Sequence, residues 1–344
     1  MIRIAFLLPH LRAGGAERVV VNWANALDRA DFAPVVMLGR VEGDFLPLLA
    51  PDVPVIALGG RRALTRPWRI ARALAAHRID LAYAATSAMN LASLAAPTRV
   101  PRIVSEHTPP DAFAREAKWP FARRLATAAL HRHAVAIAVP TPAIAQAIRH
   151  ARVAVIPNPV LADAPAPLPP AKYGRRLVAA GRLVPAKGFD TLIDAMALVP
   201  GATLTIHGDG PLRRDLARRI ADRQAPVTLA GHTAHLAPAL ADADLFVSSS
   251  RREGFGNVLI EAMAQGTPVL ATRAGGPETF IDDGVNGFLA DPDDAAALAA
   301  RIAALLADAP RRHAVRAAAR VTAARYTIGT STAQFAALAR AIAG

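Results

Sequence analysis

Cysteine is absent from this sequence of 344 residues, and aromatic residues make up only 5% of it. Without cysteine the chain forms no disulfide framework, no thiolate metal site and no cysteine nucleophile. Long apolar runs are missing as well. No stretch reaches the roughly 18 apolar residues of a membrane span, and the apolar segment Ile2–Leu8 is too short for the core of a secretory signal. These absences predict a cytoplasmic protein that is soluble or bound to the surface of a membrane.

Acidic residues are fewer than basic ones. The chain has 27 Asp and Glu against 40 Lys and Arg, which gives a net charge of +13. Residues 1–171 hold 20 Lys and Arg against 11 Asp and Glu, whereas residues 172–344 hold 20 against 16. The surplus in the first half is suited to anionic lipid, an anionic acceptor or nucleic acid, and it is also what a plain solvated surface shows. The scarcity of aromatic residues and the lack of a nucleic-acid module argue against a nucleic-acid partner.

Both halves of the chain alternate short apolar segments with helical patterns. This alternation predicts two doubly wound parallel sheets in two α/β domains with a cleft between them. The Pro-rich stretch 157–170 has no apolar periodicity and is typical of a semi-rigid linker. Strands are predicted near 2–8, 33–38, 53–57, 80–83, 102–105, 135–139 and 153–156, and again near 176–180, 202–207, 226–230, 244–247 and 268–271. From residue 293 onward only helices are predicted, near 293–307, 310–325 and 331–342.

Two carboxylates, Glu253 and Glu261, are separated by seven residues in the second half. The apolar run 244–247 before them predicts a buried strand, and Gly254 and Gly256 allow a sharp turn into a helix that begins near Asn257. The free N–H groups at the start of that helix suit a phosphate. One carboxylate is placed to accept hydrogen bonds from sugar hydroxyls and the other from ribose, so the pattern predicts a nucleotide-sugar site.

A second loop carries two cations five residues apart, Arg182 and Lys187, after the strand at 176–180. Such a pair can hold a pyrophosphate leaving group and neutralise the charge that develops as a glycosidic bond breaks. By itself the loop is equally compatible with two surface cations.

Other strand ends carry glycine turns or single histidines. Gly14 and Gly15 follow the first strand, without the third glycine of the dinucleotide fingerprint, and a plain turn would explain them too. His107 follows the strand at 102–105, at a sheet edge where ligands gather, although a single histidine is often structural. Three further turns fit either a structural role or a ligand-binding role: those at Gly208, at Gly231 with His232, and at Gly275. No His, Asp and Glu spacing fits a metal site.

The chain resembles the retaining glycosyltransferases of family 4, which have the two-domain GT-B fold. The resemblance runs from residue 1 to about 326. The matching residues occur in order along the chain: Gly14-Gly15 with Glu17, His107, Asn158-Pro159, Gly181-Arg182 with Lys187-Gly188, Gly208-Asp209-Gly210, Gly231, Glu253 through Glu261, and Gly275-Gly276 with Glu278. It implies an acceptor-binding domain at 1–165, a donor-binding domain at 172–325 and a C-terminal helix at 326–344 that packs back on the first domain.

The same resemblance implies roles for individual residues. Arg182 and Lys187 would bind the donor diphosphate, Glu261 the ribose, and Glu253 the donor sugar together with the backbone of Phe255 to Asn257. His107 would lie near the 6-position of the sugar, and Gly15 near the phosphate or acceptor. The remaining donor-site positions are Gly181, Gly208, Gly231, His232, Gly256 and Val258. Neither a cofactor nor a metal ion is implied.

The implied activity is transfer of a hexose or N-acetylhexosamine from a nucleotide sugar, expected to be a UDP sugar, to a glycan or lipid-linked acceptor of the cell envelope. A double displacement would need a carboxylate nucleophile about 5 Å from an acid. The resemblance instead implies front-face substitution with the leaving phosphate as base. A nucleotide-sugar epimerase or hydrolase on the same fold is the alternative, because the same residues would bind its donor.

A final segment, residues 115–125, places aromatic and basic residues together. Trp119, Phe121 and Leu125 alternate with four cations at positions 115, 118, 123 and 124. That composition suits a helix at an anionic membrane surface or beside a lipid-linked acceptor. The other interpretation is an amphipathic helix whose Trp119 packs into the core.

Overall fold

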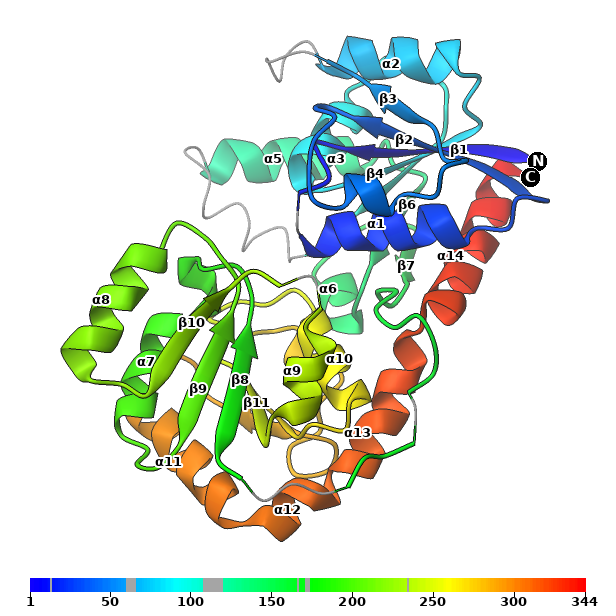
Figure 1. The fold of residues 1–344 in the computed structure, drawn as a ribbon. Helices are drawn as coiled ribbons and strands as arrows, with labels where there is room; N and C mark the ends of the chain where they lie inside the picture. The colour runs from blue at the N-terminus through cyan, green and yellow to red at the C-terminus, as the bar shows by residue number, and fades with distance from the viewer. Residues whose placement is uncertain (13, 60–65, 108–119, 166, 171–173, 234) are drawn as a thin grey trace. The chain divides into compact units, whose positions relative to one another are not determined.

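The apolar segments form two separate parallel sheets, one in each of two units of the chain (Figure 1). Unit 1 consists of Met1–Ala162 and Ile328–Gly344, and unit 2 of Asp163–Thr327. The structure is a computed structural model that describes every residue except 13, 60–65, 108–119, 166, 171–173 and 234. The predicted pair of Rossmann-like α/β domains is confirmed.

Unit 1 contains a seven-stranded sheet in the order β3-β2-β1-β4-β5-β6-β7, with every pairing parallel. The direction of winding reverses between β1 and β4, which is where open α/β sheets gather ligands at the carboxyl ends of their strands. Its strands are β1 (Ile2–Leu8), β2 (Phe32–Leu38), β3 (Val55–Ala57), β4 (Leu81–Ala85), β5 (Arg102–Ser105), β6 (Ala136–Val139) and β7 (Val153–Val155). Its helices are α1 (Gly15–Ala26), η1 (Leu46–Leu48), α2 (Arg66–Ala76), α3 (Ser87–Leu94), α5 (Pro120–His131), α6 (Pro142–Gln146) and α14 (Ile328–Ala343).

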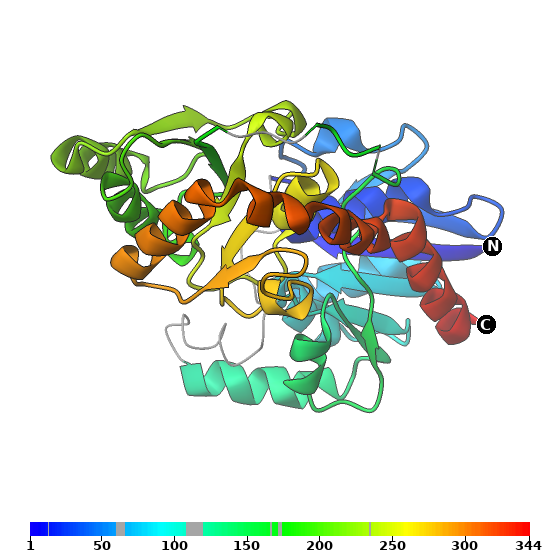
Figure 2. The ribbon, with the colours of Figure 1, turned by 90° about the horizontal axis from the view of Figure 1, so that it is seen from below.

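Helix α14, red in Figure 1 and Figure 2, belongs to unit 1 although it ends the chain. It packs beside α1, where Phe335 stacks on Trp23 with 4.4 Å between ring centroids. The rings of Phe6 and Tyr83, from β1 and β4, complete the cluster. The buried Trp23 Nε1 donates a hydrogen bond to Ser331 Oγ at 2.9 Å. Since these four rings are buried together, α14 is part of the unit 1 core.

Unit 2 repeats the same winding with six parallel strands, in the order β10-β9-β8-β11-β12-β13. Helices α7, α8 and α11 pack together on one face, and α9, α10 and α13 on the other (Figure 1). Its strands are β8 (Arg176–Ala180), β9 (Thr203–His207), β10 (Val227–Gly231), β11 (Leu245–Ser248), β12 (Val269–Thr272) and β13 (Phe288–Ala290). Its helices are η3 (Pro185–Lys187), α7 (Phe189–Ala197), α8 (Arg213–Arg223), α9 (Ala237–Asp242), α10 (Asn257–Ala264), η4 (Pro277–Thr279), α11 (Ala295–Ala307), α12 (Ala309–Ala314), α13 (Arg316–Ala323) and η5 (Ala324–Tyr326).

Two predictions about unit 2 were wrong. The sheet has a sixth strand, β13, whose short apolar run stands between the turn residues Asn286-Gly287 and Asp291, a pattern that is also typical of a loop. The single helix predicted at 310–325 is two helices that meet at Val315. Around this break two buried arginines bond to carbonyls of different elements: Arg312 to Leu305 and Arg316 to Gly266. A straight helix would place the two side chains on one face.

The predicted membrane-surface segment, residues 115–125, lies partly outside the described residues. Positions 115–119, including Trp119, are among those that the structure does not describe. Within the described ranges, no helix has both the length and the apolar character needed to cross a membrane.

Candidate functional site

Three glycine-containing loops meet at the carboxyl edge of the unit 2 sheet. Gly208, after β9, has a φ of +142°, and a Cβ there would overlap the carbonyl oxygen of Gly181, after β8. The Gly208 N–H donates to the carbonyl of Gly231, the last residue of β10, at 2.7 Å. Glycine is required at position 208 because the backbone is left-handed and another backbone lies against it. These contacts bring three of the predicted donor-site positions into one backbone cluster.

The structure joins two predicted site residues that lie 66 positions apart. The Nζ of Lys187, at the end of η3, donates a hydrogen bond to Oε2 of Glu253, which follows β11. The two side chains are 25% and 17% exposed, so the pair is sheltered but still reached by solvent. A cation suited to phosphate and a carboxylate suited to hydroxyl groups therefore stand side by side.

The lysine side chain lies across Gly181. A Cβ at Gly181 would be 3.3 Å from Lys187 Cε, so a larger residue there would crowd the lysine. Arg182, the next residue, is exposed. Its side chain makes no ion pair with any residue that the structure describes. The two predicted diphosphate cations thus differ, since Lys187 is held by a carboxylate and Arg182 is free to reach an anion.

The turn from Glu253 into α10 is fixed by a neighbouring loop. The Glu253 N–H donates to the Ala274 carbonyl at 2.9 Å, and the Gly276 N–H donates to the Glu253 carbonyl at 2.8 Å. Gly256 has a φ of +101° and precedes the first residue of α10, Asn257, as the sequence predicted. This eight-residue helix begins four residues after Glu253, so its N-terminal turn lies on the same loop as that carboxylate.

The Phe255 side chain is buried. Its ring lies 5.2 Å from that of Phe280 and 5.1 Å from that of Tyr326, measured between centroids. The Phe255 side chain is therefore packed within unit 2 and not exposed at the strand end. On α10, Val258 and Glu261 are half-buried, with Glu261 about one turn into the helix. His232 is exposed just after β10.

The predicted residues of unit 1 lie at the carboxyl edge of its own sheet. Gly15 is the first residue of α1, and a Cβ on Gly14 before it would overlap the carboxylate of Glu17. His107 follows β5, and its Nε2 lies 2.8 Å from Ser105 Oγ. Burial lowers the pKa of His107 to about 4, so the imidazole is neutral at physiological pH.

Glu106, beside His107, is turned inward. Its Oε1 lies 3.1 Å from His131 Nε2 and accepts a hydrogen bond from Asn90 Nδ2 at 3.1 Å. This buried carboxylate links β5 to α3 and α5. It therefore supports the fold and is not presented to a ligand.

Sequence reasoning missed Arg251, which lies two residues before Glu253. Its guanidinium forms a two-bond ion pair with Asp190 and also pairs with Asp293. The sequence offers the adjacent pair Arg251-Arg252, but Arg252 is exposed. The pattern alone carries no signal that tells the two apart. Among the described residues, no group of three or more His, Asp and Glu side chains is placed to hold a metal ion.

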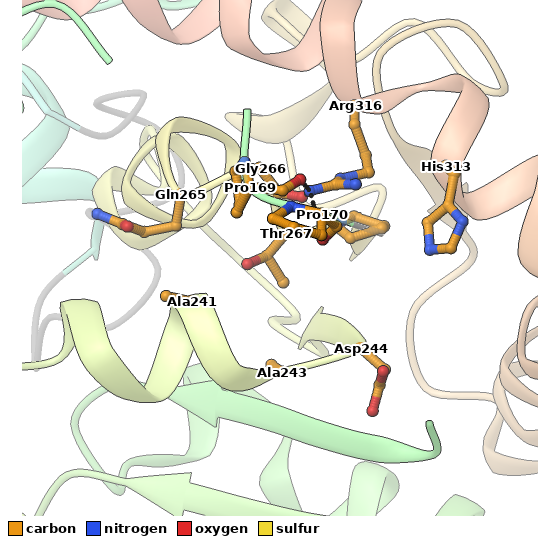
Figure 3. A pocket seen from close by; sticks show the side chains of 11 residues that line it. Pro169, Pro170, Ala241, Ala243, Asp244, Gln265, Gly266, Thr267, His313 and Arg316 are labelled. Carbon is orange, nitrogen blue, oxygen red and sulfur yellow. Dashed lines mark hydrogen bonds between the residues drawn. The ribbon is translucent and has the colours of Figure 1, made fainter. Parts of the chain in front are cut away.

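A small pocket elsewhere in unit 2 is structural. It lies beside the amino ends of β11 and β12 and contains Asp244, Thr267 and Arg316 (Figure 3). Arg316 donates hydrogen bonds to the carbonyls of Gly266 and Pro169, both at 2.7 Å. Asp244 is buried and accepts from the N–H groups of Gly174 and Arg176 at 2.9 Å. These groups tie the chain entering β8 to the rest of unit 2.

Comparison with known protein families divides the chain in the same way as its fold. Residues 13–163 match Glycosyltransferase Family 4, and residues 174–308 match Glycosyl transferases group 1. The lipopolysaccharide core biosynthesis glycosyltransferase LpsE of Rhizobium meliloti is 45% identical over 130 residues, which are 37% of this chain and 38% of the relative. The sulfoquinovosyl transferase SQD2 of Arabidopsis thaliana is 35% identical over 149 residues, which are 42% of this chain and 29% of the relative. The matches thus span less than two fifths of the length of each of these curated relatives.

Likeness to solved structures extends over the whole chain. Alr3699/HepE of Anabaena, in complex with UDP and glucose, superposes with a TM-score of 0.84 and 25% identity, over 99% of this chain and 100% of that one. Sucrose-phosphate synthase from Thermosynechococcus elongatus gives a TM-score of 0.83 at 23% identity, over 99% of both chains. The second likeness concerns the fold alone.

Proposed function

The chain belongs to the glycosyltransferases of family 4, and on that premise we propose that it transfers a hexose or N-acetylhexosamine from a UDP sugar to a glycan or lipid-linked acceptor of the cell envelope. The observation that carries the proposal is the contact between Lys187 and Glu253 at the carboxyl edge of unit 2. Two relatives support the choice of substrates. HepE was solved with UDP and glucose, and LpsE is named for lipopolysaccharide core biosynthesis.

Unit 2 is proposed to bind the donor. Arg182 and Lys187 would hold the diphosphate. The Glu253 carboxylate would accept hydrogen bonds from the sugar hydroxyls, and the backbone N–H groups from Phe255 to Asn257 would donate hydrogen bonds to them. Glu261 would bind the ribose. The nucleobase of the donor would lie beside the backbone cluster of Gly181, Gly208 and Gly231 and beside His232, which is exposed at the end of β10. The start of α10, at Gly256 to Val258, would bring helix N–H groups near the phosphates.

The proposed chemistry is front-face substitution with retention of anomeric configuration. As the glycosidic bond breaks, its electron pair and the negative charge stay on the departing β-phosphate. That phosphate would then take the proton of the acceptor hydroxyl, whose oxygen forms the new bond to the anomeric carbon on the same face. Arg182 and Lys187 would stabilise that charge, a contribution of about 3–4 kcal/mol for a well-placed donor. Neither a cofactor nor a metal ion is assigned a step.

Unit 1 is proposed to bind the acceptor, with Gly15 near the phosphate or acceptor, and His107 would lie near the 6-position of the sugar. Because His107 is neutral at physiological pH, it is able to exchange hydrogen bonds with a sugar hydroxyl without adding a charge. The basic surplus of the first half would favour an anionic acceptor or anionic lipid around it.

Glu261→Ala and Arg182→Ala test the donor site. Each should lower kcat/KM for the UDP sugar by roughly 30- to 1000-fold, corresponding to about 2–4 kcal/mol of lost transition-state stabilisation. Arg214→Ala, an exposed arginine of α8, is the matched control and should keep full activity. Near-normal kcat/KM in both site variants would contradict the assignment.

The rate of UDP release separates transfer from epimerisation or hydrolysis. A transferase releases UDP faster when a cell-envelope lipid extract is added, in proportion to the glycosylated product formed. An epimerase releases no UDP, and a hydrolase releases it at a rate independent of the extract.

Membrane attachment is proposed for unit 1. Trp68, near the start of α2, and Phe121 and Leu125, near the start of α5, are 70%, 79% and 62% exposed. Exposed aromatic and apolar side chains on basic helices suit an interface with anionic lipid. Cosedimentation with vesicles containing anionic lipid should fall when Trp68 and Phe121 become serine. Binding that is absent at low salt would contradict the proposal.

A further inference from the structure

Three consecutive backbone carbonyls of η3, the segment that ends at Lys187, accept hydrogen bonds from the loop that leads to Glu253. The Pro185 carbonyl accepts from Arg251 Nη1 at 2.8 Å, and the Ala186 carbonyl accepts from the Arg251 backbone N–H at 2.8 Å. The Lys187 carbonyl accepts from Ser249 Oγ at 3.0 Å. The Arg252 N–H also donates to the Ala186 carbonyl, at 3.3 Å. Four hydrogen bonds therefore join the two loops, and Arg251 supplies two of them, one from its backbone and one from its side chain.

The Arg251 side chain reaches further, into α7 and the chain after β13. Nη1 and Nη2 donate to the two carboxylate oxygens of Asp190, each at 2.8 Å, and Nη2 also donates to Thr191 Oγ1 at 3.1 Å. Nε donates to Asp293. Every nitrogen of the guanidinium is used, and the carboxylates of Asp190 and Asp293 raise the pKa of Arg251 despite its burial. A planar fork with five N–H donors can satisfy all these acceptors at once, whereas a lysine cannot.

The connection between Lys187 and Glu253 runs through this arginine. Arg251 stands two residues before Glu253, and the carbonyl it holds belongs to Pro185, two residues before Lys187. Gly188, after Lys187, leaves no room for a side chain, because a Cβ there would overlap the Ser249 carbonyl oxygen. A change at Arg251 would therefore alter where the lysine ammonium stands relative to the Glu253 carboxylate.

We propose that Arg251 is a positioning residue which fixes Lys187 relative to Glu253, and so sets the distance between the diphosphate and sugar subsites. The inference rests on the proposed function of those two residues. Arg251 itself touches neither substrate. Its effect is to keep a phosphate-binding cation and a hydroxyl-binding carboxylate in register for one nucleotide sugar.

The test compares Arg251→Met and Arg251→Lys with Asp293→Asn, which removes only the more exposed of the two ion pairs. For each protein one measures the Kd for UDP, the thermal unfolding midpoint, and the turnover of the UDP sugar that the wild-type protein consumes fastest. Misplacing a reacting group by about 1 Å costs on the order of 100-fold in rate. We expect a loss of about that size in Arg251→Met, a smaller loss in Arg251→Lys and nearly none in Asp293→Asn, while the Kd for UDP changes far less than turnover.

A double-mutant cycle with Lys187→Met identifies the route of action. If Arg251 acts through Lys187, adding Arg251→Lys to Lys187→Met lowers turnover no further, because the positioned group is already gone. Losses that multiply would overturn the proposal. So would an Arg251→Met protein with wild-type turnover, or one whose turnover and UDP affinity fall equally. If Arg251→Met does not fold, the cycle with Arg251→Lys decides alone. A wild-type protein that neither binds UDP nor consumes any UDP sugar would instead overturn the proposed function, and this inference with it.

Discussion

The two units have the same winding but use the polar residues at their strand ends differently. In unit 2, Lys187 and Glu253 pair with each other while remaining partly exposed. In unit 1, Glu106 is 4% exposed and is surrounded by Asn90 and His131. A partly exposed ion pair contributes little to stability and can exchange partners with a ligand, whereas breaking a buried one is costly. The comparison indicates that the unit 2 pair remains able to exchange partners, whereas unit 1 uses its carboxylate for its fold.

The cores of the two units also differ, in where their aromatic side chains lie. Four aromatic rings fill the centre of unit 1, and one of them, Phe335, comes from the last helix of the chain. The main cluster of unit 2 is mostly aliphatic. The aromatic residues Phe255, Phe280 and Tyr326 form a separate group directly behind the loop that carries Glu253. The ring contacts of Phe255 therefore anchor the loop that carries Glu253 to the rest of unit 2.

The largest expected effect would come from emptying the unit 1 core. Phe335→Ala should lower the free energy of unfolding of unit 1 by about 3–5 kcal/mol, because it removes the stack on Trp23 and leaves a cavity. Calorimetry should show the unit 1 transition shifted down and the unit 2 transition in place. Phe335→Leu, which keeps most of the volume, should cost much less. If Phe335→Ala costs under about 1 kcal/mol, α14 is not part of this core.

The next effect concerns activity rather than stability. Lys187→Met should lower kcat/KM for the UDP sugar by about 100- to 1000-fold, since it removes a cation from the developing charge on the leaving phosphate. Its unfolding midpoint should stay close to wild type. Glu106→Gln in unit 1 should do the reverse, with a lower unfolding midpoint and nearly full kcat/KM. Equal losses of activity in both variants would remove the distinction between the two units.

Much of the fold could be predicted because the central strands of both sheets are buried on both faces and appear as apolar runs. The segment 2–8 and the segment 176–180 were predicted with the bounds that β1 and β8 have. The edge strand β13 could not be, since it is defined by its pairing with β12 and its own apolar run is flanked by turn residues. Similarly, the interruption at Val315 carries no proline or glycine signal, and the contacts of the two buried arginines beside it appear only in the packed unit.

For the candidate site, the sequence placed the residues but not their contacts. Glu253, Gly256 and Asn257 were predicted at a strand end and a helix start, and the structure has them there. The contact of Lys187 with Glu253 depends on how two loops, 66 residues apart, pack against each other. The turning inward of Arg251 rather than Arg252 depends on the same packing. Such contacts leave no periodicity in the sequence.

A smaller effect is expected from pH. His107 has a pKa of about 4 in the folded protein and an ordinary pKa near 6.5 when unfolded. Above pH 6.5 both forms are neutral. As the pH falls from 6.5 toward 4, the unfolded chain binds a proton that the folded one does not, so stability falls. Between pH 6.5 and 5 this contribution reaches about 2 kcal/mol.

Urea unfolding at pH 7 and pH 5 checks this effect in unit 1. The wild-type protein should lose more stability between the two pH values than His107→Gln, which cannot take up the proton. Near pH 7, where His107 is almost wholly neutral in both states, the stability of the two proteins should change with pH at nearly the same rate. Parallel losses in both would mean that His107 is not the group responsible.

The smallest expected effect is that of a chelator on transfer. Arg182 and Lys187 already provide two positive charges for the diphosphate, and a divalent ion would need carboxylates of its own, whereas Glu253 is paired with Lys187. Excess EDTA should therefore leave the rate of UDP release by the wild-type protein unchanged. Magnesium should restore part of the rate only in Lys187→Met, where it replaces the missing positive charge. A wild-type rate that EDTA abolishes and manganese or magnesium restores would show that the cationic side chains of unit 2 are not sufficient for the leaving group.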